Sequence, residues 1–309
     1  MQPRSDLNEM VRSAWPWATA FSKQLRALRS VPFHGSHLMF GSDYSGSHSG
    51  SQFRTYGFVI GDADASPERP ARCRKSRTAF LANGRRMAFK SLNDSQRRRA
   101  LIPFLEASEA LDGHVVVVAI NKKLTHISTH QGSVGVWETL YGFQARWDPR
   151  AFEEMVRVSH FFSLFLAAWS SPNMNISWMT DEDDIVANVG RLDDAHQFAA
   201  RLCTLHVPHR LREFIMNTPA VMPDELMFED FLAIPDLAAG MIGEILKTKP
   251  ANQFKSRLSV YNDQPLTEKS DIIADWFWHN SGTLKKTCIL IDQADDGKFG
   301  IERLQMNLL

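Results

Sequence analysis

The sequence predicts an α/β fold in which helices cover a mixed central sheet. Short segments with the residue types of β-strands alternate with longer segments that have helical periodicity. Residues 114–122 contain an unbroken apolar run, which is typical of a strand buried on both faces in a parallel or mixed sheet. A predicted helix precedes this strand and separates it from three earlier ones. These patterns together favour a sheet with helices packed on it.

Length and composition indicate an ordinary globular protein. The chain has 309 residues, enough for one large domain or two ordinary ones, and its 35 basic residues balance its 35 acidic ones. Only the distribution of charge can therefore indicate a nucleic-acid partner. Three widely spaced cysteines argue against a disulfide framework or zinc site and favour the cytoplasm. We expect no secretory signal, and no apolar stretch reaches the roughly 18 residues of a membrane span.

The first half of the chain is predicted to supply four strands. Its elements are an amphipathic helix at 7–28, strands at 37–46, 54–61 and 85–92, a helix from Asp94 or Ser95 to Asp112, and the strand at 114–122. Pro16 and Pro103 are expected to kink or divide the two helices. The segment 62–75, rich in Pro, Asp and Arg, is expected to be a loop.

The second half is predicted to alternate apolar helices with short strands. Its elements are helices at 149–170, 191–205 and 234–246, a strand at 175–180, an edge strand at 210–216, and a tail unit with a helix at 270–279, strands at 288–291 and 299–304, and a turn at 295–297. Pro235 is expected to lie in the first turn of the 234–246 helix, where its missing N–H is tolerated.

Carboxylates stand at the ends of two predicted strands and at the start of one helix. Asp43 ends the apolar part of 37–46, Asp181 follows the strand at 175–180, and Asp236 begins the 234–246 helix. A buried carboxylate is costly unless it is paired, hydrogen-bonded or bound to a metal. Simpler explanations stay open, because Asp43 can cap its own turn and Asp236 suits a helix N-terminus. Asp181 can equally belong to a solvated acidic turn.

A cluster of these carboxylates would point to a divalent cation. Carboxylates brought together raise one another's pKa, so such a cluster normally implies a bound cation. Oxygen ligands without His or Cys companions suit Mg²⁺ or Mn²⁺. On the helix before residue 112, Glu109 lies nearer the apolar stripe than Glu106 and is the better candidate to point inward. The candidate catalytic residues are therefore Asp43, Asp181, Asp236 and Glu109.

A basic segment supplies a second, independent signal. Between residues 69 and 99 the chain carries eleven Lys and Arg residues against the single acidic residue Asp94. On a neutral chain this concentration predicts a positive face suited to a phosphate backbone. The alternative is a solvated loop, which charged runs usually are. The candidate nucleic-acid-binding residues are Arg74, Lys75, Arg77, Arg85, Arg86, Lys90, Arg97 and Arg98.

Three short motifs resemble a known family. They are Phe-Gly-Ser-Asp-Tyr-Ser-Gly at 40–46, Trp-Met-Thr-Asp-Glu at 178–182, and Ile-Pro-Asp-Leu-Ala-Ala-Gly at 234–240. In content and order they resemble the bacterial family called domain of unknown function 3800, which belongs to the ribonuclease H-like superfamily. The resemblance implies a ribonuclease H-like domain at 37–249, between an N-terminal helical extension at 1–36 and a C-terminal helix and hairpin extension at 250–309.

The resemblance also implies roles for residues and a setting. Asp43, Asp181 and Asp236 would be metal ligands, with Glu182 or a helix glutamate as a further acid. One position departs from the family pattern, since Tyr44 stands where Glu is usual. That departure suggests a one-metal enzyme or an inactive domain. Members of this family resemble parts of phage-defence or mobile-element loci.

These observations lead to three hypotheses. The first is a metal-dependent phosphodiester hydrolase, specifically a nuclease acting on DNA or RNA in the cytoplasm. The second is a catalytically inactive ribonuclease H-like module that binds nucleic acid or a partner protein. The third is an enzyme acting on another phosphorylated substrate, for which no Gly-rich phosphate loop is visible. Nucleic acid is the expected partner, a protein partner or a second copy is a further candidate, and a membrane is not expected.

Overall fold

The structure is a computed structural model that describes residues 17–29, 31–46, 50–124, 142–219, 225–248, 259–260, 266–279, 282–293 and 299–306. The chain forms two compact units that interleave along the sequence. Unit 1 comprises residues 1–34, 124–176 and 182–216, and unit 2 comprises residues 35–123, 177–181 and 217–309. The predicted helical residues 7–16 and the predicted turn at 295–297 lie outside the described residues.

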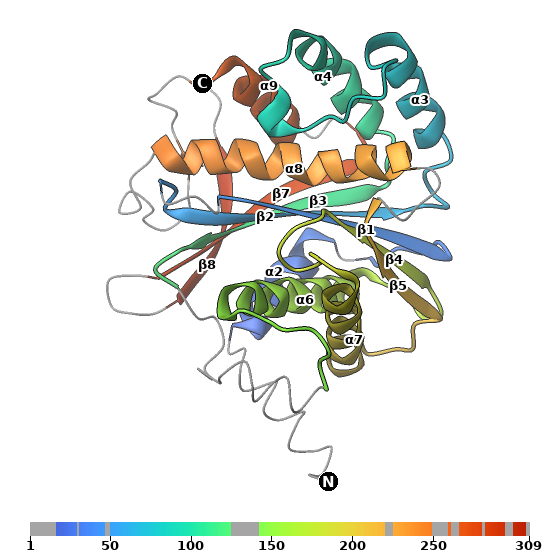
Figure 1. Cartoon of the computed structure of the whole chain (residues 1–309), viewed down its shortest axis with the longest axis vertical. Helices are drawn as coiled ribbons and strands as arrows, with labels where there is room; N and C mark the ends of the chain where they lie inside the picture. Colours follow the sequence, from blue (N-terminus) through green and yellow to red (C-terminus); the bar gives the residue numbers. More distant parts are fainter. Residues whose placement is uncertain are drawn as a thin grey trace. The chain divides into compact units, whose positions relative to one another are not determined.

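Unit 2 is built on a mixed β-sheet (Figure 1). Its strands are β1 (His37–Ser45), β2 (Phe53–Asp62), β3 (Gly113–Asn121), β4 (Asn175–Thr180, whose last four residues belong to this unit), β6 (Ser259–Val260), β7 (Leu284–Gln293) and β8 (Phe299–Met306), in the order β4-β1-β2-β3-β7-β8-β6. The β1–β2, β2–β3 and β7–β8 pairs are antiparallel, whereas β3–β7 and β6–β8 are parallel. The predicted α/β class with a mixed sheet is therefore confirmed.

The centre of this sheet is β3, as its apolar sequence predicts. Every residue of β3 is buried, and the strand pairs with β2 on one side and β7 on the other. The parallel partner β7 comes from the C-terminal segment of the chain, which thus contributes strands to the same sheet as β1. Five of the other predicted strands, at 37–46, 54–61, 175–180, 288–291 and 299–304, are also present.

Four helices of unit 2 lie on one side of its sheet (Figure 1). They are α3 (Arg69–Phe80), α4 (Ser95–Ser108), α8 (Glu225–Thr248) and α9 (Glu268–Trp278), together with the short 3-10 helix η1 (Phe89–Ser91). The buried core joins α4, α8 and α9 to β2, β3 and β7. Helix α8 approaches β2 closely, and Thr55 donates its hydroxyl hydrogen to the carbonyl oxygen of Ala239 at 3.2 Å.

Three predictions about unit 2 are wrong. The expected loop at 62–75 contains the start of helix α3, and the expected strand at 85–92 is irregular apart from η1. Helix α8 begins at Glu225 rather than at residue 234, so Pro235 lies inside the helix. The reason is that apolar residues from Phe231 to Leu246 are buried, and this packing outweighs the hydrogen bond that Pro235 cannot donate.

Unit 1 is mainly helical. Its elements are α2 (Ala18–Leu28), α6 (Pro149–Trp169), α7 (Val189–His206), the first two residues of β4, and β5 (Glu213–Asn217) up to Met216. Asp148 caps α6 by accepting hydrogen bonds from two backbone N–H groups of its first turn. Phe21 of α2 packs on Phe161 with ring centroids 5.1 Å apart, and the indole N–H of Trp169 donates to the carbonyl of Leu25. The predicted helices at 149–170 and 191–205 are confirmed.

Among the described residues, no helix combines the length and the apolar character needed to cross a membrane.

Candidate metal centre

Asp43 projects to the face of the sheet that α8 covers. In the register of β1 and β2 it lies opposite Gly57, and a Cβ atom on Gly57 would be 2.4 Å from the backbone oxygen of Pro235. Residues directly opposite in antiparallel strands share a face. A Cβ atom on Gly41, two residues earlier and on the same face, would be 2.9 Å from the ring of Phe231 of α8. Asp43 therefore lies within β1, not at its end. It projects to the face of the sheet that is covered by α8, the helix that carries Asp236.

Asp236 lies in the middle of α8 and is buried at its carboxylate. Its Oδ2 accepts a 2.7 Å hydrogen bond from the backbone N–H of Phe89. Burial raises the pKa of Asp236 to about 6, against the lowering effect of the Phe89 hydrogen bond. The charge of Asp181 raises this pKa further, while Lys90 and Lys269 lower it. The expectation that Asp236 begins this helix is therefore wrong, and a favourable position at a helix N-terminus does not explain it.

Asp181 reaches the same region from the end of β4. Its backbone N–H donates to the carbonyl oxygen of Ser42, the residue before Asp43, at 3.3 Å. Its side chain is exposed, and its negative charge acts on Asp236. Three aspartates thus approach one region of unit 2 from β1, the end of β4 and the middle of α8.

Phe89 and Lys269 complete this region and were not anticipated from the sequence. The ring of Phe89 lies against Gly240 of α8, where a Cβ atom would be 2.3 Å away. The ammonium of Lys269 in α9 lies 4.1 Å from the centre of the Phe89 ring and 3.3 Å from the Phe89 carbonyl oxygen. Phe89 was assigned to a strand, and a lone Lys at a helix start carries no sequence signal.

The residues present suit a hydrated divalent cation better than a closed metal cage. Among the described residues, no three His, Cys, Asp or Glu side chains are arranged to hold a metal ion. Mg²⁺ commonly binds through one or two carboxylates, with water and substrate oxygens completing its shell. Asp181 and Asp236 supply two carboxylates whose mutual repulsion a cation would relieve. The donor set is compatible with Mg²⁺ or Mn²⁺.

Tyr44 lies on the opposite face of β1 from Asp43. Its hydroxyl is 2.8 Å from the hydroxyl of Ser42 and 3.4 Å from that of Thr180, and its ring packs edge-on against Phe58. Because neighbouring residues of a strand project to opposite faces, a Glu at position 44 would not join Asp43 at α8. The substitution at this position is therefore weak evidence against a metal site beside Asp43.

The remaining acidic candidates lie elsewhere. Glu109 caps the C-terminal end of α4, and its Oε1 accepts a hydrogen bond from the ammonium of Lys286 on β7. Since β7 is three strands from β1, at about 4.8 Å per strand, this ion pair is remote from Asp43. Glu182, the residue after Asp181, is exposed and belongs to unit 1.

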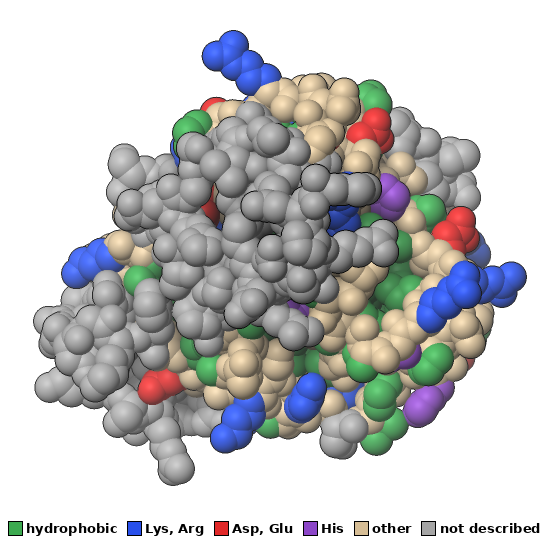
Figure 2. Space-filling view, turned by 90° about the horizontal axis from the view of Figure 1, so that it is seen from below, with side chains coloured by type: hydrophobic (Ala, Val, Ile, Leu, Met, Phe, Trp, Pro, Cys, Tyr) green, Lys and Arg blue, Asp and Glu red, His purple; other side chains and the backbone are tan. Residues whose placement is uncertain are grey.

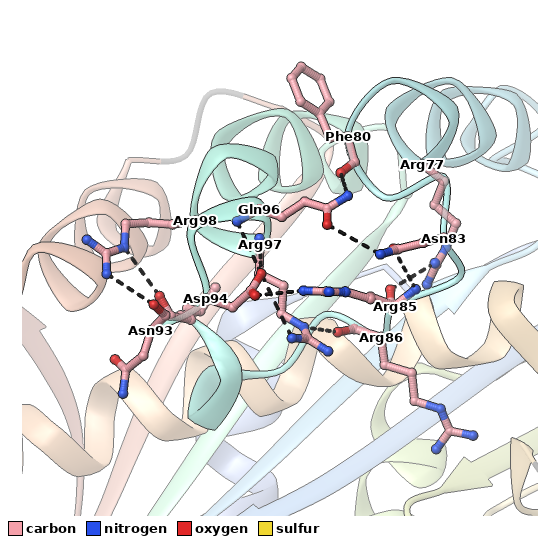
Figure 3. Close-up of polar contacts among 11 residues, drawn as sticks. Arg77, Phe80, Asn83, Arg85, Arg86, Asn93, Asp94, Gln96, Arg97 and Arg98 are labelled. Carbon is pink, nitrogen blue, oxygen red and sulfur yellow. Dashed lines mark hydrogen bonds and ion pairs between the residues drawn. The ribbon is translucent and has the colours of Figure 1, made fainter.

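The arginine-rich segment is held together by its own polar contacts (Figure 3). Arg85 forms a 2.7 Å ion pair with Asp94, which also caps α4, and Arg97 donates to the carbonyl oxygen of Arg86. Arg77 donates to the carbonyl oxygen of Arg85 at 3.1 Å. We call Arg77, Arg85, Asp94 and Arg97 the arginine clasp. These contacts hold the loop that follows α3 against the N-terminal end of α4. Phe89 comes directly after this loop in the sequence.

Most of the predicted nucleic-acid-binding residues have acidic partners. Arg77 makes two 2.7 Å contacts with the buried carboxylate of Asp230. Arg86 pairs with Glu229, and Arg98 pairs with Glu268. The exposed cations of the set that form no ion pair among the described residues are Arg74, Lys75 and Lys90. The predicted continuous positive face is thus reduced to a few side chains.

One face of the molecule can be inspected directly. On the face drawn in Figure 2, the Lys and Arg side chains of the described residues are spread singly and do not gather into one patch. Lys90 and Lys269 act on Asp236, where both lower the pKa of its carboxyl group.

No protein-family model matches this chain, and no curated protein matches it either.

Proposed function

We propose that this protein is a divalent-metal-dependent phosphodiester hydrolase, specifically a nuclease. The observation that carries the proposal is the buried carboxylate of Asp236, which lies near the carboxylate of Asp181 and near the ammonium groups of Lys90 and Lys269. A site that combines carboxylates with ammonium groups can bind a cation and a phosphate at the same time. Asp43 shares the α8 face of the sheet and supplies a further carboxylate.

Each residue has a distinct part in this proposal. Asp181 and Asp236 would hold Mg²⁺ or Mn²⁺, with Asp43 beside them on the α8 face of the sheet. The cation would polarise a phosphate oxygen and lower the pKa of a bound water. The backbone N–H of Phe89 donates a hydrogen bond to Oδ2 of Asp236 and so orients the carboxylate. Lys90 and Lys269 would neutralise the phosphate backbone beside the cation. Arg74 and Lys75 remain available as more distant backbone contacts.

The ribonuclease H-like assignment is part of the proposal. It is supported by the antiparallel β1–β2–β3 meander and by β4 lying beside β1, with helix α8 carrying the third aspartate on one face. The three motifs that resemble domain of unknown function 3800 all fall within these elements. A cytoplasmic nuclease with a role in phage defence or mobile elements is the setting that this resemblance suggests.

An inactive nucleic-acid-binding module is the second candidate. The observation in its favour is that no three-ligand metal cluster occurs among the described residues. Under this alternative the carboxylates are structural, and binding depends on Arg74, Lys75, Lys90 and Lys269.

The two candidates differ in their response to metal and to two substitutions of site aspartates. We would titrate Mg²⁺ and Mn²⁺ into wild type, Asp43→Asn and Asp181→Asn, and measure both melting temperature and cleavage of mixed DNA and RNA substrates. The control is Asp193→Asn, which removes an exposed carboxylate from α7 in unit 1. The proposal expects metal-dependent stabilisation and cleavage in wild type and control, with both lost in the site variants. Wild type that neither gains stability nor cleaves would refute the metal site and leave the binding module.

A further inference from the structure

A groove lies on the outer side of unit 2, between α4 and α9. It has a volume of about 510 Å³, which is within the range of ligand-binding clefts. Its apolar part is formed by Ile102 on α4 and by Ile272 and Trp276 on α9. Ile102 is 52% exposed, which is unusual for a large aliphatic residue. The indole N–H of Trp276 has no hydrogen-bond partner among the described residues.

The rim of the groove is acidic. Glu106, Asp271 and Asp275 line it with exposed carboxylates. Asp275 has a local partner in His279, one turn further along α9, at 2.9 Å. Among the described residues, no Lys or Arg lines the groove. Carboxylates around an apolar floor favour an occupant that carries both positive charge and an apolar group.

The outer face of α3 has the complementary character. Arg74, Lys75 and Thr78 are exposed and follow the spacing of one helix face. Cys73, in contrast, is buried, and Phe80 lies seven residues later on the same row of the helix, away from Arg74 and Lys75. The outer face of α3 therefore displays basic groups on aliphatic stems, the combination of charge and apolar surface that the groove suits.

These two surfaces occupy different positions in one layer of helices. In Figure 1 helices α9, α4 and α3 lie in a row over α8, so the groove is bounded by α9 and α4 while α3 ends the row. One copy can therefore present its groove and its α3 at the same time. An interface between two different patches of identical chains is heterologous, and it extends from copy to copy unless its rotation closes a ring.

We propose that the groove between α4 and α9 binds helix α3 of a second copy of this chain. The basic residues Arg74 and Lys75 would face the acidic rim, and their aliphatic stems would cover Ile102 and Trp276. The formal net charge of +0 leaves little overall repulsion to oppose association. The contact joins charged surfaces, so raising the salt concentration weakens it.

The test is self-association of the full chain, measured by sedimentation velocity across protein concentration at low and high salt. The groove variant carries Asp271→Lys and Asp275→Lys, and the helix variant carries Arg74→Glu and Lys75→Glu. The combined variant carries all four changes. The control carries Asp193→Lys and Glu213→Lys, which give the same change in net charge as the groove variant but at exposed positions of unit 1. Circular dichroism confirms that every variant is folded.

The proposal expects salt-sensitive association of wild type and of the control. The groove and helix variants should each raise the dissociation constant roughly tenfold or more, and the combined variant should restore association because the charges are exchanged. Wild type that stays monomeric at every concentration would overturn the proposal and leave the groove to a basic segment of another protein. Association that survives in both single-surface variants would overturn it as well.

Discussion

The backbone N–H of Phe89 donates a 2.7 Å hydrogen bond to Oδ2 of Asp236, 147 residues further along the chain. This bond joins the arginine-rich segment to the carboxylate site. The arginine clasp fixes the loop that precedes η1, and η1 places Phe89 against Gly240 on α8. The arginines that the sequence suggests for nucleic-acid binding thus serve first to position a group that orients Asp236.

Asp236 makes the stability of the metal-free protein depend on pH. Its folded pKa of about 6 is above its ordinary value of 3.8, so the folded chain holds this proton more tightly than the unfolded chain. The contribution is complete below the unfolded pKa and is lost as the pH rises through about 6. Denaturant unfolding in a chelator from about pH 4 to about pH 7 should show a loss of about 2 kcal/mol from this group.

Asp236→Asn should remove this part of the pH dependence, whereas Asp193→Asn should keep it. Adding Mg²⁺ or Mn²⁺ to wild type should stabilise the protein more at neutral pH, where Asp236 is charged, than at about pH 4. An Asp236→Asn profile that parallels wild type would contradict the assignment.

Glycine at position 57 is needed for α8 to reach the sheet. A Cβ atom there would be 2.4 Å from the backbone oxygen of Pro235, which cannot give way as a side chain can. We expect Gly57→Ala to lower the free energy of unfolding by about 1–3 kcal/mol. Gly243 lies in α8, and a Cβ atom there would be 3.6 Å from the Thr55 hydroxyl oxygen, an ordinary van der Waals distance. Gly243→Ala should therefore raise the free energy of unfolding by up to about 1 kcal/mol. Urea unfolding of both variants checks this difference in sign.

Arg77 should matter for stability more than the other arginines of the clasp. Its side chain is 11% exposed and that of its partner Asp230 is 3% exposed. Arg77→Leu leaves Asp230 buried without this counter-charge, which should cost about 3–5 kcal/mol. In the exposed Arg85–Asp94 pair the fractions are 41% and 30%, so Arg85→Leu should cost less than about 1 kcal/mol. Equal losses in thermal unfolding would contradict the difference in burial.

Glu109 is expected to stabilise the fold without taking part in catalysis. Its partner Lys286 has a fully buried side chain, and burial lowers the pKa of that lysine while Glu109 raises it. Glu109→Gln should therefore lower the free energy of unfolding by about 1–3 kcal/mol and leave metal-dependent cleavage at the wild-type level. Loss of cleavage with unchanged stability would instead place Glu109 in the site.

Local patterns in the sequence were sufficient for many of the elements. The valine-rich run of β3, the apolar helix α6 and the strand before Asp181 each have strong periodicity or burial signals. Segments with weak signals were misassigned. Helix α3 has an arginine-rich, polar composition, and its helical form depends on packing beside α4 rather than on an apolar stripe.

The sequence by itself determined which residues could form a carboxylate site, because Asp43, Asp181 and Asp236 follow strong local patterns. Only the tertiary structure decided their environments. Helix α8 extends across Gly57 and buries Asp236, whereas the Glu109 carboxylate is held by Lys286 from a strand encoded 177 residues later. Such assignments depend on contacts between distant segments, which local propensity and spacing do not specify.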